Sequence, residues 1–284
     1  MLLVTGATGT VGREVLRRLP EFTAGVPVRV MAREPGRVTG APVAAEIVRG
    51  DFTDPRSLAG VLRGVHRALL LSLPSAGGDA CFLRAARMAG VRHVVKLSAA
   101  AVVDVGAVDL VTRWQRRSEE LLCGSGMAWT LLRPRAFMSN TLSWAGSVRR
   151  CGVVRALFGT SLNACVDPRD VAEAAVRALT GEGHEGRAYT LTGPGVLSAV
   201  DQTQQLAELL GRVLRFEELG VEQARAALAA RYSAEVVQAL LESAWRGREG
   251  SKCGVDGTVP ALLGRPAGDF RGWAADHLGA FGAR

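Results

Sequence analysis

Short apolar runs alternate with amphipathic runs along the first two thirds of the chain. The apolar runs have strand length and cover residues 2–5, 27–32, 45–49, 68–73, 93–97 and 129–132. The amphipathic runs repeat apolar residues at helical spacing and cover residues 10–19, 55–62, 79–88 and 114–122. A strand that is apolar throughout, such as residues 68–73, is typical of a parallel sheet buried on both faces. The alternation predicts βαβ units, and we expect an α/β fold of the Rossmann type, with a doubly wound parallel sheet.

The last third of the chain has a different, mostly helical pattern. Asp167 and Pro168 are typical of a helix start, because aspartate caps a helix and proline suits its first turn. A short strand is expected at residues 189–192, followed by helices at residues 200–210, 221–230, 234–245 and 270–281, with a Gly/Arg-rich linker at residues 246–254. We expect an NADP(H)-binding domain over residues 1–160. Residues 161–284 should form a small, mainly helical substrate-binding region, interleaved with the sheet and packed over its carboxyl edge.

The chain lacks the sequence signals of membrane insertion and export. No apolar run reaches the roughly 20 residues that a membrane helix needs, and the first strand starts where a signal peptide would lie. The five cysteines show no metal-ligand spacing and are expected to be reduced thiols. We therefore predict a cytoplasmic protein without a metal site and without a membrane partner.

The net charge of +8 raises the question of nucleic-acid binding. Only two of the 35 basic residues are lysines, and the arginines are scattered along the chain. This distribution indicates a compositional preference for arginine, so we predict no nucleic-acid partner. The surplus positive charge suits an anionic ligand such as a phosphorylated dinucleotide.

A glycine-rich turn joins the first strand to the first helix. Glycine at every third position allows a tight turn, close approach of backbone N–H groups to a pyrophosphate, and close packing of helix on strand. The helix start adds partial positive charge for the phosphates. The predicted contacts are Gly6, Thr8, Gly9, Thr10, Val11 and Gly12.

The end of the second strand is where such a fold reads the adenosine ribose. An acidic residue there accepts the 2′-hydroxyl of NAD, whereas an arginine suits the 2′-phosphate of NADP. Arg33 occupies this place, which favours NADP(H). Asp51 and Phe52 follow the third strand and should lie near the adenine. Asp51 either bonds the adenine amino group or caps the next turn.

Several motifs together resemble the NmrA-like branch of the atypical short-chain dehydrogenase/reductases, which includes NADPH quinone reductases and redox-sensing regulators. The motifs lie at residues 4–12, 49–54, 95–98, 133–140, 166–172, 191–194 and 263–266. The resemblance covers nearly the whole chain and implies a Rossmann domain, a small C-terminal substrate region and NADP(H). It also implies further cofactor contacts at Leu71, Ser72, Leu73, Arg133 and Pro134.

The proton donor typical of this superfamily is missing. Typical short-chain reductases use a tyrosine with a lysine four residues later, because the alkoxide made by hydride addition needs an acid. Trp114 and Ser118 occupy these two places, and Gln115 replaces a histidine that many family members carry. Neither of the two tyrosines, Tyr189 and Tyr232, has a lysine four residues later.

Ser98 and Lys96 remain as candidate catalytic residues. They lie two positions apart at the end of the fifth strand and therefore share one face of it. Lys96 could donate to the cofactor ribose or to a developing oxyanion, or it could pair with a neighbouring acid.

We expect an NADPH-dependent reductase, acting on a carbonyl of a bulky aromatic molecule in secondary metabolism or antibiotic biosynthesis. Trp114, Phe137 and Met138 are the expected substrate contacts, although such side chains are often core residues. An NADPH quinone reductase and a non-catalytic NADP(H) sensor remain as alternatives. Water or an acidic hydroxyl of the substrate would supply the proton.

Overall fold

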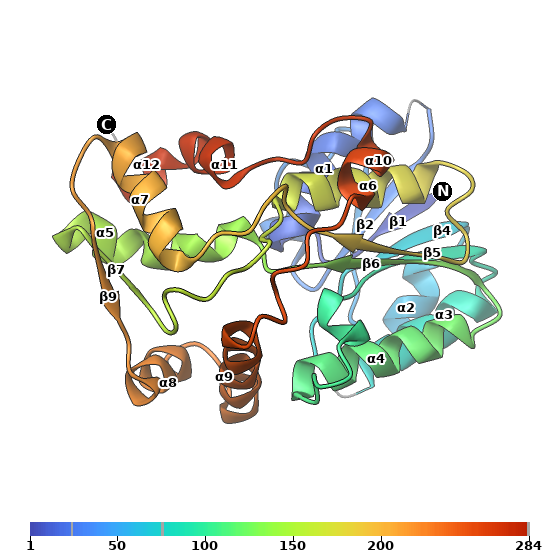
Figure 1. Cartoon of the computed structure of the whole chain (residues 1–284). Helices are drawn as coiled ribbons and strands as arrows, with labels where there is room; N and C mark the ends of the chain where they lie inside the picture. The colour runs from blue at the N-terminus through green and yellow to red at the C-terminus, as the bar shows by residue number, and fades with distance from the viewer. Residues whose placement is uncertain (24, 75–76, 283–284) are drawn as a thin grey trace. The chain divides into compact units, whose positions relative to one another are not determined.

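The computed structural model describes residues 1–23, 25–74 and 77–282 (Figure 1). Contacts between residues group the chain into two compact units. Unit 1 comprises residues 1–102, 114–134 and 168–190, and unit 2 comprises residues 103–113, 135–167 and 191–284. This grouping says nothing of independent folding, so a domain division at residue 160 stays a prediction.

Unit 1 is built on a seven-stranded sheet. Its strands are β1 (Leu2–Val4), β2 (Val28–Ala32), β3 (Glu46–Arg49), β4 (Arg67–Leu70), β5 (His93–Leu97), β6 (Ala128–Pro134) and β8 (Arg187–Leu191). Their order across the sheet is β3-β2-β1-β4-β5-β6-β8, and every neighbouring pair from β3 to β6 is parallel. The strand order reverses between β1 and β4. Ligands of open parallel sheets bind beyond the carboxyl ends of the strands at such a point.

Helices cover both faces of this sheet (Figure 1). They are α1 (Thr10–Phe22), α2 (Pro55–Val61), α3 (Gly78–Met88), α4 (Leu110–Cys123) and α6 (Pro168–Thr180), with 3₁₀ turns η1 (Pro35–Arg37) and η2 (Ala100–Val103). On one face α1 packs against α6. On the other, α2, α3 and α4 bury Leu58, Phe82 and Leu122 against Leu3 and Val94 of the strands. The predicted doubly wound α/β fold is confirmed.

Unit 2 is mainly helical. Its elements are η3 (Met138–Trp144), α5 (Ala145–Cys151), β7 (Val153–Ala156), α7 (Ala199–Leu210), β9 (Arg215–Glu218), α8 (Val221–Ala229), α9 (Ala234–Arg248), α10 (Thr258–Leu263), α11 (Phe270–Asp276) and α12 (Leu278–Phe281). Strands β7 and β9 pair in parallel. Apolar side chains form several small clusters, and one of them joins Met138 to Phe270 and Trp273.

The structure differs from the sequence prediction at three places in this unit. The expected helix over residues 270–281 is two helices, because the chain leaves helical geometry at His277. Helix α9 continues to Arg248, which shortens the expected linker. Strands β7 and β9 were not expected. Within the described residues, no helix combines the length and apolar character that crossing a membrane requires.

Candidate functional site

The chain leaves β1 through a turn that only glycine can form at two positions. Gly6 has φ of +62°, and a Cβ on it would lie 2.5 Å from the carbonyl oxygen of Leu71. A Cβ on Gly12 would lie 2.2 Å from the carbonyl oxygen of Gly6. Both distances are shorter than a carbon–oxygen contact allows. The turn therefore packs backbone against backbone, which leaves room for a ligand above it.

The start of α1 provides hydrogen-bond donors beside this turn. The first N–H groups of a helix have no carbonyl partner within the helix. The capping residue Gly9 has no side chain to accept from them, and the first turn contains no acidic residue. Gly9 and Thr10 are exposed, whereas Val11 is buried beneath them and Thr8 is half-buried. These residues fit the pyrophosphate of a dinucleotide.

The expected adenosine end lies beyond β2 and β3. Arg33 follows β2 directly and is exposed. Asp51 Oδ1 accepts from the backbone N of Thr53 at 2.8 Å and from its hydroxyl at 2.7 Å. These bonds hold the pKa of Asp51 below its usual value, together with the nearby charge of Arg33. Asp51 thus caps the turn, as one of the two sequence interpretations has it. Phe52 packs edge-on against Phe82 with ring centroids 5.5 Å apart.

The segment after β4 passes next to the glycine turn. The Thr5 hydroxyl donates to the carbonyl of Leu69 and accepts from the N–H of Leu71, both at 2.9 Å. Leu71 is buried, whereas Leu73 is 77% exposed. The hydroxyl oxygen of Ser72 is buried without a hydrogen-bond partner in the described part of the chain. An unpaired buried hydroxyl next to the turn is the kind of group that a bound ligand satisfies.

Ser98 has the same property. It follows β5, its backbone N donates to the carbonyl of Leu132 at 2.7 Å, and its buried hydroxyl has no partner within the described residues. A serine hydroxyl that is free of protein partners can donate to an oxygen of a substrate or a cofactor.

Lys96 is fully buried and already has partners. Its ammonium donates to Gln115 Oε1 at 2.9 Å and to the carbonyl of Leu97 at 3.1 Å, and it lies 3.6 Å from Asp79 Oδ2. It also lies 5.0 Å from the ring centre of Trp114. Burial lowers the pKa of Lys96, and the carboxylate of Asp79 opposes that shift. The structure thus brings Lys96 and Trp114 together, and it bears out the pairing of Lys96 with an acid.

The contact with Lys96 fixes the orientation of the Gln115 amide. An ammonium group only donates hydrogen bonds, so the amide must turn its oxygen towards Lys96. The NH₂ group of Gln115 then points away from Lys96. The hydroxyl of Ser118 donates to Asp79 in a short bond, so Ser118 belongs to this buried network too.

Arg133 forms a two-pronged ion pair with Glu119 of α4, with N–O distances of 3.0 and 2.6 Å. This pair fixes the end of β6 against α4, where Pro134 is buried. Phe137 and Met138 belong to unit 2. Phe137 is half-buried, and Met138 is buried against Phe270 and Trp273. Their role in substrate binding stays a prediction, as does the contact of Arg133 and Pro134 with the cofactor.

A model of NAD(P)H-binding proteins matches residues 6–182, more than half of the chain. The chain belongs to this family. This result confirms the resemblance to NmrA-like atypical short-chain dehydrogenase/reductases. It also confirms that the cofactor is a nicotinamide dinucleotide of the NAD(P)H type.

Relatives of this family member are named as reductases. The (4-alkanoyl-5-oxo-2,5-dihydrofuran-3-yl)methyl phosphate reductase of Streptomyces griseus is 54% identical over 282 residues, which are 99% of both chains. The NAD(P)H azoreductase of Xenophilus azovorans is 34% identical over 288 residues, with 100% of both chains covered. The structure of an Escherichia coli NADPH-dependent quinone oxidoreductase complexed with NADPH has a TM-score of 0.86, with 24% identity over 98% of this chain and 99% of that one. The protein is an NAD(P)H-dependent oxidoreductase.

Neither tyrosine of this NAD(P)H-binding protein stands in for the missing acid. The hydroxyl of Tyr189 contacts His184 Nδ1 at 2.9 Å, and the carbonyl of His184 accepts from Thr130. Thr130 in turn contacts His93, the first residue of β5. This network therefore lies at the amino end of the strands, opposite to the edge that carries the glycine turn. Tyr232 lies in unit 2 and is exposed.

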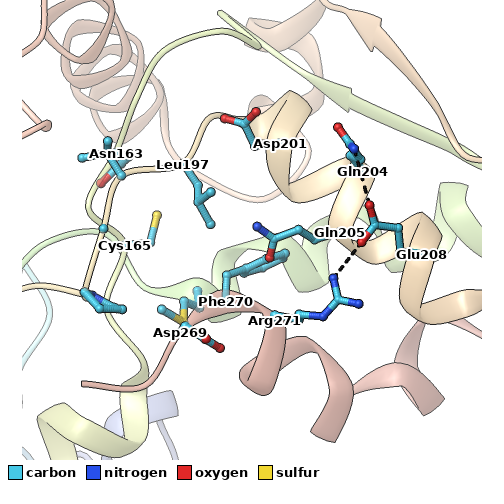
Figure 2. Close-up of a pocket in the computed structure, with 14 residues that line it drawn as sticks. Asn163, Cys165, Leu197, Asp201, Gln204, Gln205, Glu208, Asp269, Phe270 and Arg271 are labelled. Atoms are coloured by element: carbon cyan, nitrogen blue, oxygen red, sulfur yellow. Dashed lines mark hydrogen bonds and ion pairs between the residues drawn. The ribbon is translucent and has the colours of Figure 1, made fainter. Parts of the chain in front are cut away.

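Unit 2 contains a cavity of about 610 Å³, a volume typical of small-molecule sites (Figure 2). Gln204, Gln205 and Glu208 reach it from α7, and Phe270 and Arg271 line it from α11 (Figure 2). Arg271 donates to Glu208 at 2.7 Å. On the other side Asn163 and Cys165 contribute, and burial raises the pKa of the Cys165 thiol to about 11. The thiol is therefore inert at neutral pH.

The sequence interpretation missed the acidic partners. Asp79 and Glu119 hold Lys96 and Arg133 in place, yet neither was a candidate residue. Asp79 stands in the first turn of α3, where an acid is common because it suits the helix dipole. Its position gives no sign that the side chain is buried.

Proposed function

We propose that this enzyme uses NADPH to reduce the conjugated carbon–carbon double bond of a phosphorylated alkanoyl butenolide. The observation that carries the proposal is the full-length similarity to the Streptomyces griseus reductase, at 54% identity. The expected place in secondary metabolism belongs to the same proposal, because this relative comes from a Streptomyces species.

The chemistry of this substrate class explains how a reductase works without the usual acid. In the compound that names the relative, the ring double bond joins the carbon with the phosphomethyl group to the carbon with the alkanoyl group. NADPH supplies a hydride when it is bound. As the hydride reaches the first of these carbons, the electron pair of the double bond moves to the second. That carbon lies between a ketone and a lactone carbonyl, so both oxygens share the negative charge.

Such a delocalised enolate needs no strong acid nearby. A ketone reduction creates an alkoxide, which requires a proton as it forms. Here the charge already rests on two carbonyl oxygens, and a proton from water completes the reaction afterwards. Hydrogen-bond donors suffice to stabilise the anion. The absence of a tyrosine–lysine pair supports a substrate of this kind.

Ser98 and Gln115 are the donors that this chain offers. The Ser98 hydroxyl has no protein partner in the described residues, and the amide NH₂ of Gln115 points away from Lys96. We assign both groups to hydrogen bonds with the enolate oxygens or the cofactor. Lys96 acts through Gln115 as a positioning residue, because its own ammonium is enclosed by protein groups.

A preference for NADPH over NADH rests on Arg33. Its guanidinium is exposed at the end of β2, where an arginine can pair with the 2′-phosphate of the ribose. The glycine turn and the start of α1 would hold the pyrophosphate of either cofactor.

An electron-poor aromatic acceptor is the second candidate substrate. The azoreductase relative, 34% identical over the full length, favours it. A quinone or an aromatic ketone beside a phenol would also carry the developing charge itself. The indole of Trp114 would suit such a ring.

The test is NADPH oxidation with a synthetic alkanoyl butenolide phosphate, followed by the loss of NADPH absorbance. NADPH deuterated at the transferable position should place deuterium on the ring carbon that bears the phosphomethyl group. In deuterated water the deuterium should appear on the neighbouring carbon. Quinones, azo dyes and phenolic ketones are assayed in parallel.

Turnover of an aromatic acceptor alone would replace the proposal with the second candidate. If NADPH binds in a titration but none of these acceptors is reduced, both candidate substrate classes are wrong.

A further inference from the structure

Two cationic side chains of unit 2 make no direct ion pair within the described residues, although the carboxylates of Asp104 and Asp109 act on them from a distance. Arg135 follows β6, and its buried Nε has no hydrogen-bond partner within the described residues. Lys252 follows α9, and in the same part of the chain its ammonium has no hydrogen bond or ion pair. Cations that are partly removed from water are normally paired, because burial of an unpaired charge is costly.

Arg135 lies beside the loop that follows α9 and carries Lys252, and its charge acts on the lysine ammonium. A Cβ on Gly254, two residues beyond Lys252, would lie 3.9 Å from Arg135 Nη2. Residue 164 donates its backbone N–H to the carbonyl of Lys252 at 3.0 Å, which fixes the loop. Arg135 is fixed by its own N–H, which donates to the carbonyl of Leu191 at 2.9 Å.

The arm of Lys252 is held by Gly247 of α9. A Cβ at this buried glycine would lie between 3.2 and 3.3 Å from Cδ, Cε and Nζ of Lys252. The lysine side chain therefore packs closely against the helix at Gly247, where a Cβ would crowd it. Packing of the aliphatic part of the side chain restricts the position of the ammonium group.

A third cation nearby is already neutralised. Arg246 lies 2.7 Å from Asp109 Oδ2 and 3.5 Å from Asp104 Oδ2. Arg246 thus makes the direct ion pairs with these two carboxylates, which act on Arg135 and Lys252 only from a longer distance. Burial and the charges of Arg246 and Arg135 lower the pKa of Lys252 to about 8. At neutral pH the ammonium is still mostly charged, so the cluster has an excess of positive charge.

We infer that Arg135 and Lys252 bind the phosphate group of the substrate, with Arg246 as the paired cation behind them. A planar guanidinium and an ammonium together provide N–H groups that donate hydrogen bonds to phosphate oxygens. The inference rests on the proposed function for the identity of the substrate, whereas the excess of positive charge favours an anion of any kind. In the sequence, Arg135 directly follows Arg133 and Pro134, which the family resemblance implies as cofactor contacts.

The first test measures the ionisation of Lys252 itself. The chain has two lysines, so methylation with ¹³C-formaldehyde gives few NMR signals, and a Lys252→Arg variant assigns the signal of Lys252. The protein is saturated with NADP⁺ so that cofactor phosphates are already bound. Propyl phosphate should raise the pKa of Lys252 from about 8 towards the ordinary value of 10.5, and propanol should leave it unchanged.

The second test measures specificity by comparing kcat/KM for the butenolide phosphate and for the matching alcohol. Arg135→Gln and Lys252→Met should each reduce the preference for the phosphate by about 10- to 100-fold, the effect of losing a hydrogen bond to a charged group. Arg231→Gln removes an exposed charge from the same unit and serves as the control.

The outcomes separate this inference from the proposed function. A pKa of Lys252 that ignores propyl phosphate, or a phosphate preference that survives both substitutions, overturns the inference while the reductase stands. If the wild-type enzyme does not reduce the butenolide phosphate but propyl phosphate still shifts Lys252, the proposed substrate fails and the anion site stands.

Discussion

Replacement of Lys96 by methionine should cost unit 1 a large share of its stability. Lys96 and Asp79 have side chains that are 0% and 4% exposed, and their charged atoms lie 3.6 Å apart. One oxygen of Asp79 has no partner among the described residues even now. Loss of the ammonium would leave a buried carboxylate with Ser118 as its donor. Removal of one partner from a buried pair costs about 3–5 kcal/mol.

Urea unfolding followed by tryptophan fluorescence measures this cost. The double variant Lys96→Met/Asp79→Asn should lose less than about 2 kcal/mol, because no buried charge remains. Arg117→Met removes an exposed cation from α4, paired there with Glu120, and should stay within about 0.5 kcal/mol of wild type. If Lys96→Met loses under about 1 kcal/mol, or if the double variant is no more stable than the single one, the buried-pair argument is wrong.

Three further predictions concern the ribose phosphate contact, the glycine turn and the pH dependence of stability. Arg33→Ala should raise the KM for NADPH by about tenfold and leave that for NADH unchanged, and an equal rise for both would exclude the phosphate contact. Gly12→Ala should abolish cofactor binding in a titration, because its Cβ would lie 2.2 Å from the carbonyl oxygen of Gly6. Gly60→Ala is the control, because a Cβ at Gly60 meets open space. This variant should still bind the cofactor, and its free energy of unfolding should rise by about 0.5–1 kcal/mol. Burial lowers the pKa of His93. Just below pH 6.5 the imidazole is therefore protonated in the unfolded chain but still neutral in the folded chain. The contribution of His93 to stability should be constant above about pH 6.5 and fall below it, and His93→Gln should flatten that fall.

The alternation of strands and helices in unit 1 could be predicted because each element carries its own signal. A strand such as β1 is buried throughout and is an unbroken apolar run, whereas α1 shows apolar residues on one side only. The glycine turn was predictable for the same reason, because its residues are close together in the sequence.

The missed elements of unit 2 have no local signal. Strands β7 and β9 have four residues each, and Arg155 and Glu217 on them pair with one another while both remain exposed. Four residues with a charge among them do not establish a period. The helix break at His277 is equally hidden, because the apolar spacing continues through it and the imidazole is held by the Trp273 ring, 4.3 Å away.

The side-chain pairs of the site depend on distant residues. Lys96 was recognised as unusual among the basic residues, but its partner Asp79 lies on another element. Lys252 and Arg135 belong to segments far apart in the sequence, and the action of one charge on the other becomes visible only in three dimensions. From composition alone, the surplus positive charge indicates only a general preference for arginine.

The return of residues 168–190 to unit 1 determines when the cofactor site can be completed during synthesis. Helix α6 packs against α1, and Glu173 of α6 pairs with Arg18 of α1 at 3.2 Å. A nascent chain that ends before Pro168 already contains the whole glycine turn, but it lacks α6, the helix that packs against α1. The edge strand β8 is also still missing at that stage. The ribosome must therefore deliver unit 2 residues 135–167 before unit 1 can close, and affinity for NADPH should arise late in translation.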